Sequence, residues 1–182
     1  DQQFADDVSR SSANDIVVND SNQAQNSSVL KTAPYSKFWF AEAKITALAA
    51  SNVFKIVAFS TIDGFIHVHD LVTTKEISRI NLNYEVKQIV ITLNWGFVVA
   101  SSEEMITILS PNGEQIKSFR APFVIDKIFT CSIKAGFDYI SFSTFENQVG
   151  YFEAMYPESW TDLKKCDSSV IRITYDNLHR TF

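Results

Sequence analysis

The chain has 182 residues, and its 16 lysines and arginines against 21 aspartates and glutamates give a net charge of −5. A composition of 46% hydrophobic and 20% charged residues allows a buried core and excludes a disordered tail, and the length fits one domain. The mild acidity, with no basic run, indicates a surface for neither nucleic acid nor anionic lipid. No apolar stretch reaches the roughly 18–20 residues that span a membrane.

The cysteines and the first residues of the chain bear on its compartment and its completeness. Cys131 and Cys166 are too few for a disulfide scaffold, so we expect a reducing, cytoplasmic compartment. Any membrane association is expected to be peripheral and indirect, through the full-length protein. The polar start, DQQFADDVSR, has neither an initiator methionine nor a signal-peptide pattern, which predicts a fragment of a longer protein.

Residues 1–36 form a polar N-terminal segment, rich in Asp, Asn, Gln and Ser up to residue 33. One apolar island, Ile16–Val18, interrupts this segment. We interpret the island, together with residues 37–41, as the remnant of a structural unit that precedes the repeats described next.

From residue 37 onward the sequence consists of short apolar runs that are rich in β-branched and aromatic residues and are separated by turn residues. No segment sustains the i, i+3, i+4, i+7 spacing of a long amphipathic helix. Runs of four to six such residues are typical of strands, so the sequence predicts an all-β fold.

The runs repeat with a period of about 40 residues. Ser60 matches Ser101 at an offset of 41, and Phe97 matches Phe137 at an offset of 40. Such a period, built from four short strands, is the signature of a WD40-type β-propeller blade. We expect a partial propeller, since a closed one usually needs about seven blades. Its 37–182 region would hold three full blades and the start of another, at 43–82, 83–121, 122–163 and 168–182.

Each repeat predicts four strands in different environments. The first strand would line the central channel, and the second is almost wholly apolar because neighbouring blades cover it. The third follows a tight turn, for which Asp63-Gly64 is the strongest signal, and charges gather on the outer strand and the turns. The expected strands are 45–49, 56–60, 65–69, 86–91, 97–101, 105–109, 116–119, 125–129, 137–141 and 149–152.

The repeats depart from the usual WD40 motifs. WD40 blades usually end the third strand with Trp-Asp, whereas here that place reads His69-Asp70, Leu109-Ser110 and Phe152-Glu153, and no Gly-His dipeptide occurs. The buried His–Ser–Trp–Asp hydrogen-bond network of a standard blade therefore cannot form. We expect apolar packing between blades to replace it, at roughly 0.8 kcal/mol per buried CH₂ group.

Three stretches resemble a known family. FKIVAFSTIDGFIHVHDL, ITLNWGFVVASS and GFDYISFSTFENQVGYFEAMY are similar to the WD40 propeller at the C-terminal end of BEACH-domain (beige and neurobeachin-like) proteins, particularly divergent protist members. The similarity covers roughly residues 37–156 and includes no catalytic motif. It implies a scaffold that binds other proteins and works in vesicle trafficking, membrane fusion or fission, or autophagy.

His67 and His69 are candidate metal ligands. His67 and His69 are two residues apart on a predicted strand and so face the same side, as ligands of zinc or copper could. A chelate needs three or four ligands, and apart from the opposite-facing Asp70 no Cys, Asp or third His stands at ligand spacing. We therefore predict no metal and no cofactor, and interpret His69 as the residue at the degenerate Trp position.

No catalytic constellation is recognisable. Cys131 is interpreted as a small buried hydrophobic residue and Cys166 as a surface thiol, because no histidine lies near either in sequence. The polar residues of the predicted first strands do not form a known site: Thr46, Lys87, Gln88, Asp126, Lys127 and Arg172. We predict a non-catalytic, protein-binding scaffold with no small-molecule or nucleic-acid ligand. A scaffold of another cytosolic complex (coat or signalling) and an enzymatic or ligand-binding propeller stay open as alternatives.

The tryptophans are the best candidates for contacts with a partner, because Trp is enriched in interface hot spots. Trp95 stands at the entry to a second strand, where Phe54 matches it, and we interpret it as blade packing. Trp160 lies in the acidic stretch PESWTD. We predict that Trp160, with the neighbouring Glu158 and Asp162, contributes to a protein interface.

Overall fold

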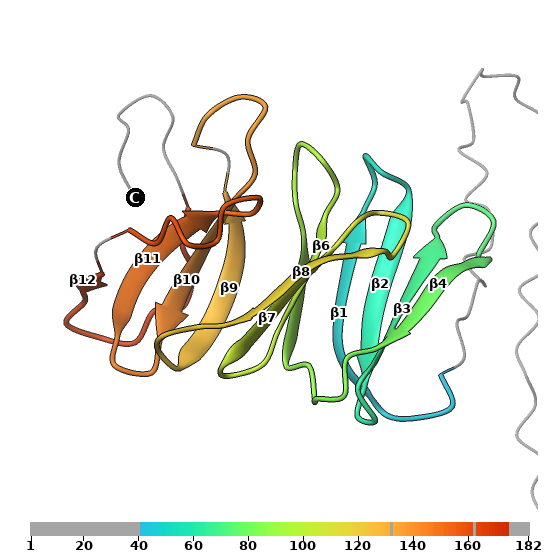
Figure 1. Ribbon diagram of the computed structural model, residues 1–182, viewed down its shortest axis with the longest axis horizontal. Helices are drawn as coiled ribbons and strands as arrows, with labels where there is room; N and C mark the ends of the chain where they lie inside the picture. Colours follow the sequence, from blue (N-terminus) through green and yellow to red (C-terminus); the bar gives the residue numbers. More distant parts are fainter. Residues whose placement is uncertain (1–40, 132, 162, 175–182) are drawn as a thin grey trace, which may run out of the picture. The chain divides into compact units, whose positions relative to one another are not determined.

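The computed structural model of the chain describes residues 41–131, 133–161 and 163–174. Within these ranges the backbone forms twelve β-strands and no helix, and hence no helix that could cross a membrane (Figure 1). The N-terminal segment 1–36 with Ile16–Val18, the single residue Asp162 and the last part of the expected fourth blade, from residue 175, lie outside the described residues.

The twelve strands form three antiparallel sheets of four strands each, and every sheet takes its strands consecutively from the chain. We name the sheets blades 1, 2 and 3. Blade 1 contains β1 (Ile45–Ser51), β2 (Ile56–Thr61), β3 (Phe65–Asp70) and β4 (Glu76–Asn81). Blade 2 contains β5 (Gln88–Ile91), β6 (Val98–Ser101), β7 (Met105–Leu109) and β8 (Gln115–Arg120). Blade 3 contains β9 (Ile125–Cys131), β10 (Tyr139–Thr144), β11 (Gln148–Glu153) and β12 (Lys164–Lys165).

The structure confirms the all-β prediction and the four-strand rhythm. All ten strands expected from the sequence are present, each with ends within three residues of the expected limits. The structure adds the two outer strands β4 and β12, whose limits the sequence had not indicated. The third strands end at Asp70, Leu109 and Glu153, so the degenerate Trp-Asp pairs stand where the repeat predicts them. Residues 168–174 form no strand, and the fourth blade stays a prediction.

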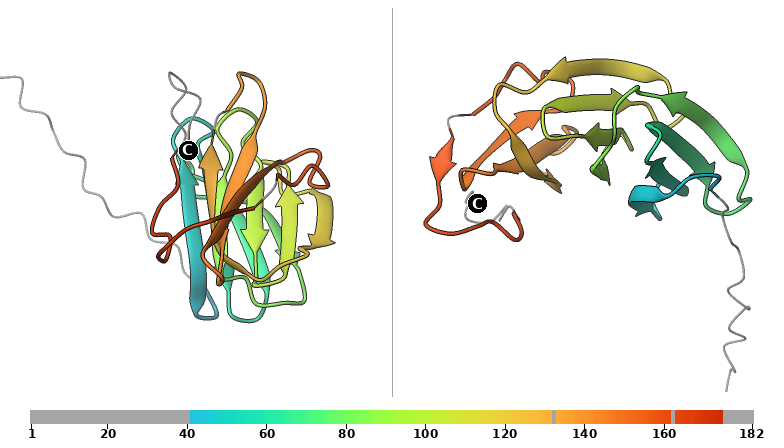
Figure 2. Two further views of the ribbon diagram at one scale, coloured as in Figure 1. Left: turned by 90° about the vertical axis from the view of Figure 1, so that its left-hand side faces the viewer. Right: turned by 90° about the horizontal axis from the view of Figure 1, so that it is seen from below.

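Burial follows the position of a strand within its blade. Every residue of β2 and of β6 is buried, whereas the outer strands β4 and β8 alternate between exposed and half-buried residues. The first strands β1, β5 and β9 lie side by side in contact, and β4 and β8 run along the opposite, outer side (Figure 2). A strand covered on both faces has to be apolar throughout, which explains the continuous hydrophobic runs of the second strands.

Two apolar clusters join the blades. In the first, Ile66 and Val68 of blade 1 pack in one core with Val98 and Leu109 of blade 2. In the second, residues from β7 of blade 2 share a core with residues from β10 and β11 of blade 3: Ile106, Ile108, Ile140, Phe142 and Phe152. Because each core draws on two sheets, the blades are held together by apolar packing, as the sequence predicted.

Candidate interaction pocket between blades 2 and 3

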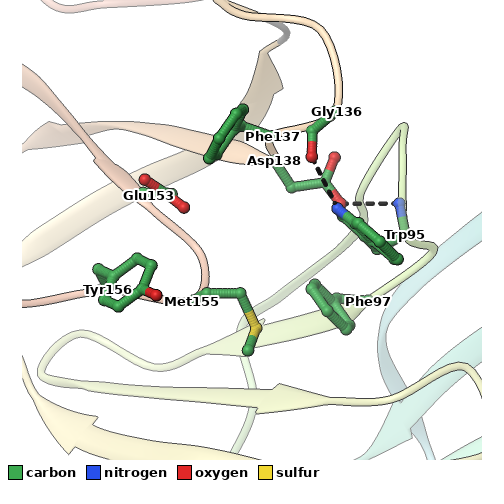
Figure 3. Close-up of a pocket in the computed structure, with 8 residues that line it drawn as sticks. All are labelled: Trp95, Phe97, Gly136, Phe137, Asp138, Glu153, Met155 and Tyr156. Atoms are coloured by element: carbon green, nitrogen blue, oxygen red, sulfur yellow. Dashed lines mark hydrogen bonds between the residues drawn. The ribbon is translucent and has the colours of Figure 1, made fainter.

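A pocket of about 320 Å³ lies between blades 2 and 3, where the β5–β6 loop approaches the β9–β10 loop and the turn after β11 (Figure 3). Its walls combine aromatic and apolar side chains with two carboxylates and one glycine. The lining residues are Trp95, Phe97, Gly136, Phe137, Asp138, Glu153, Met155 and Tyr156.

Asp138, at the end of the β9–β10 loop, holds the two blades together at the pocket. Its side chain is buried, with 3% of the residue exposed, and its carboxylate accepts four hydrogen bonds from the β5–β6 loop. The Thr92 hydroxyl donates at 2.5 Å, the backbone N–H groups of Asn94 and Trp95 at 2.8 and 2.9 Å, and the Asn94 side-chain amide at 3.2 Å. A buried carboxylate requires such partners, so this network fixes the shape of both loops.

Trp95 forms one wall of the pocket. Its indole N–H donates a 2.9 Å hydrogen bond to the backbone carbonyl of Gly136, across the boundary between the blades. The bond orients the ring, yet 56% of the residue remains exposed. Although the sequence interpretation assigned Trp95 to blade packing, the structure presents much of its surface to solvent at the pocket.

The turn after β11 supplies the wall that faces Trp95 and Phe97. The Tyr156 N–H donates to the Glu153 carbonyl at 3.0 Å, which closes a tight turn and places Met155 and Tyr156 beside the pocket. Both residues are largely exposed large hydrophobics. An aromatic pocket with the Glu153 carboxylate in its wall is suited to an apolar side chain next to a positive charge.

Trp160 packs against the apolar cluster that joins blades 2 and 3. It is half-buried and makes edge-on or tilted contacts, with ring centroids 4.6–5.8 Å apart, to four phenylalanines of blades 2 and 3 and the segment between them: Phe119, Phe123, Phe142 and Phe152. It is part of the cluster that joins the two blades.

The other two residues predicted to form an interface with Trp160 are differently placed. Glu158 is exposed and forms a 3.0 Å ion pair with Lys117 of β8. A hydrogen bond from its own backbone N–H, followed by the bond from Lys117, lowers the pKa of the Glu158 carboxyl. Asp162 lies outside the described residues. The interface prediction for Trp160, Glu158 and Asp162 stays a prediction.

The structure brings a third ligand-type side chain to the two histidines. Glu76 of β4 pairs in register with His69 of β3. Its Oε2 lies 3.1 Å from His67 Nδ1 and 3.6 Å from His69 Nε2. This glutamate was not among the residues predicted from the sequence, where only cysteine, aspartate and histidine were considered as further ligands. The predicted hairpin between the third and the outer strand could have identified Glu76, because it places the start of the outer strand opposite the end of the third strand.

The remaining candidates are scattered. Cys131 is buried, as predicted, whereas Cys166, expected at the surface, is half-buried. The polar residues of the first strands make separate contacts and form no common site: Thr46 to Ser60 at 2.8 Å, Lys87 to Glu103 at 2.5 Å, Lys127 to the Val170 carbonyl at 2.8 Å, and Gln88 to the backbone of Ile128 in blade 3 at 2.9 Å.

Sequence comparison finds no family model that matches the chain. The comparison with curated proteins finds no match in sequence either. Solved structures do match in three dimensions. The WD40 repeats of RRP9 give a TM-score of 0.59 at 11% identity, over 72% of this chain and 41% of that one. U3-55K gives 0.59 at 10% identity, over 72% and 42%. BamB from Moraxella catarrhalis gives 0.53 at 15% identity, over 64% and 37%.

This chain therefore spans about two fifths of the length of these three propeller proteins. At such low identity the similarity concerns the fold. Together with the three four-stranded sheets, it shows that the described residues adopt the WD40-type β-propeller fold in the form of a partial propeller.

Proposed function

We propose that this chain is a non-catalytic protein-binding scaffold, and that the pocket between blades 2 and 3 receives a partner segment carrying a large apolar side chain next to an arginine. The observation that carries the proposal is the aromatic pocket, whose loops are fixed by the buried Asp138 network before any partner arrives. Preformed sites rich in Trp and Tyr are typical of interface hot spots, because little conformational entropy is lost when they bind.

The charge of the pocket favours a basic partner. Within the described part of the chain, Glu153 takes part in no ion pair, while the Asp138 carboxylate is occupied by its four donors. An arginine can pair with a carboxylate and also stack on an aromatic face, which makes it the cation best suited to these walls. The net charge of −5 attracts a basic segment at long range.

Binding without catalysis is proposed because the pocket lining holds no nucleophile beside a base, and the Asp138 carboxylate is occupied by its four donors. Its eight residues include no Ser, Cys, His or Lys that could serve as a nucleophile or as the partner of a general base. Shape and charge at the pocket instead support recognition of an extended segment.

Selection from a library of random 12-residue peptides tests the proposal. We expect the selected peptides to share a large apolar residue beside an arginine, and to bind at least tenfold more weakly to Trp95→Ala and to Glu153→Gln. Val53→Ala is the matched control, since Val53 is exposed in the corresponding β1–β2 loop of blade 1. Two results would refute the proposal that the pocket binds a partner segment. One is selected peptides that bind Trp95→Ala as tightly as the unmodified chain, and the other is failure to select any peptide.

The sequence resemblance supports a narrower proposal, that this scaffold belongs to a cytoplasmic BEACH-type protein that serves vesicle trafficking. The stretch FKIVAFSTIDGFIHVHDL in blade 1 contributes to that resemblance. The coding sequence upstream decides the matter. A BEACH domain encoded there supports the proposal, and its absence favours a scaffold of a coat or signalling complex.

A further inference from the structure

The side chains of His67, His69 and Glu76 converge on one face of the β3–β4 hairpin in blade 1. Their nearest donor atoms, one from each residue, all lie within 4.8 Å of one another. His67 and His69 are two residues apart on β3, and the strand register places Glu76 opposite His69. The cluster belongs to a different blade from the pocket and is independent of it.

One hydrogen bond of the His69 imidazole leaves its other ring nitrogen available to a metal ion. Its Nδ1 lies 3.2 Å from the backbone carbonyl of Thr74, and a carbonyl can only accept, so Nδ1 carries the proton. Nε2 is then the unprotonated nitrogen, with its lone pair free. This Nε2 is buried and has no hydrogen-bond partner among the described residues. A histidine whose second nitrogen donates to a backbone carbonyl has the arrangement found around bound metals.

Without a metal, Glu76 has one partner in this cluster, the His67 Nδ1–H, which donates to its Oε2 at 3.1 Å because a carboxylate can only accept. An ion bound at His67 Nδ1 would take the place of this proton, which is released or carried by Nε2 of the same ring. The side of Glu76 that faces His69 has no such donor.

Glu76 Oε2 faces the lone pair of His69 Nε2 at 3.6 Å, and two acceptors facing each other repel unless a cation or a proton lies between them. No lysine or arginine pairs with Glu76 in the described part of the chain, and Arg79, on the same outer strand, is engaged with Glu42 and the Phe65 ring. A bound cation would satisfy both groups.

Two of the three separations are close to those around a small tetrahedral ion. Metal–ligand bonds of about 2.0–2.1 Å at tetrahedral angles separate the ligand atoms by about 3.3 Å. The separations from Glu76 Oε2 are 3.1 Å to His67 Nδ1 and 3.6 Å to His69 Nε2. All three ligand atoms lie within 4.8 Å of one another, so rotation of the imidazole rings, which stack against Phe59, has to bring the two histidine nitrogens closer to close the site.

We propose that His67 Nδ1, His69 Nε2 and a Glu76 carboxylate oxygen bind a divalent transition-metal ion, with zinc as the expected metal and water in the fourth position. Two imidazoles and one carboxylate are a known zinc ligand set. The ion would link β3 to the outer strand β4 and so strengthen the edge of blade 1. Glu76, which is half-exposed, gives the ion access from solvent.

Titration with Zn²⁺ in competition with a chromophoric chelator tests the site, using the whole chain. We expect one equivalent to bind, the melting temperature to rise with Zn²⁺ concentration, and Co²⁺ to give the strong visible absorption of a tetrahedral complex. His69→Gln and Glu76→Gln should each weaken binding at least tenfold and abolish the thermal shift. Glu114→Gln is the matched control, because Glu114 is an exposed glutamate in the corresponding hairpin of blade 2.

Two results would overturn the proposal. One is the absence of saturable Zn²⁺ binding by the unmodified chain, which requires no variant to fold. The other is equal Zn²⁺ affinity in the unmodified chain and both variants, which would assign the binding to other residues.

Discussion

The Gln88 side chain and the Ile128 backbone are joined by a hydrogen bond that crosses from blade 2 to blade 3. The Ile128 N–H donates to Gln88 Oε1 at 2.9 Å, and Gln88 Nε2 donates to the backbone carbonyl of Asp126. β5 and β9 lie side by side but belong to separate sheets. The amide of Gln88 therefore acts as an additional peptide group that satisfies two backbone groups at the inner edge of blade 3.

Replacing Gln88 with leucine should lower the free energy of unfolding by about 1–3 kcal/mol, because the Ile128 N–H and the Asp126 carbonyl lose a partner at a half-buried site. Urea denaturation measures the change. Gln115→Leu, at an exposed position of β8, is the control and should have an effect below about 0.5 kcal/mol. Equal effects of the two substitutions would contradict the role given to Gln88.

Gly113 is required by a close approach between blades 1 and 2. Its φ is +79°, and a Cβ atom built on it would lie 1.6 Å from Ser78 Oγ of β4. Gly113→Ala should therefore destabilise the chain through both backbone strain, about 1–2 kcal/mol, and a clash between blades. Equilibrium unfolding of the variant gives the total cost.

Gly136 separates these two contributions. Its φ is +80°, but a Cβ atom there would meet no atom within 4 Å. Gly136→Ala should therefore be destabilised by backbone strain only, without a steric clash. Gly113→Ala should be clearly more destabilising than Gly136→Ala, and adding Ser78→Gly to Gly113→Ala should recover part of the difference. If the two alanine variants unfold at the same urea concentration, the close approach does not exist in solution.

Truncation of Trp160 should destabilise the chain far more than truncation of Trp95. Trp160→Ala removes a ring packed among four phenylalanines and should cost about 3–5 kcal/mol of stability. Trp95→Ala removes a largely exposed ring and one hydrogen bond, so about 1 kcal/mol or less is expected. Thermal melts of both variants measure the difference. A Trp160→Ala variant as stable as the unmodified chain would contradict the packing of Trp160 among the phenylalanines.

The Cys131 thiol should be chemically inert in the native chain. Burial raises its pKa to about 11, so about 0.1% of it is thiolate at pH 8, against roughly a quarter of an ordinary thiol. Iodoacetamide should leave the native Cys166→Ser variant unmodified and label it after unfolding. Because the folded state holds this proton more tightly, stability should fall as the pH rises from about 9 towards 11. Rapid native labelling of Cys131 would show that the thiol is accessible.

Residue patterns predicted the strands because the second strands are apolar throughout and turn residues separate the runs. The strand Ile56–Thr61 and the third-strand ends at Asp70 and Leu109 follow from local sequence and the 40-residue period. Phe54 matching Trp95 also placed both residues in equivalent loops. The period could not distinguish their surroundings, because the side chains they meet come from neighbouring blades.

The chain's own residues thus determine the all-β character, the strand order and the blade repeat, since these depend on alternation, turn chemistry and spacing along one segment. Tertiary structure alone decided that Trp95 meets Gly136 and Tyr156 around a pocket, that Trp160 is packed among phenylalanines, and that Glu76 joins two histidines. Contacts between blades depend on how the sheets stack, which a periodic pattern does not encode. The contact of Glu76 with the histidines depends on the register of the β3–β4 hairpin, and a bulge shifts that register.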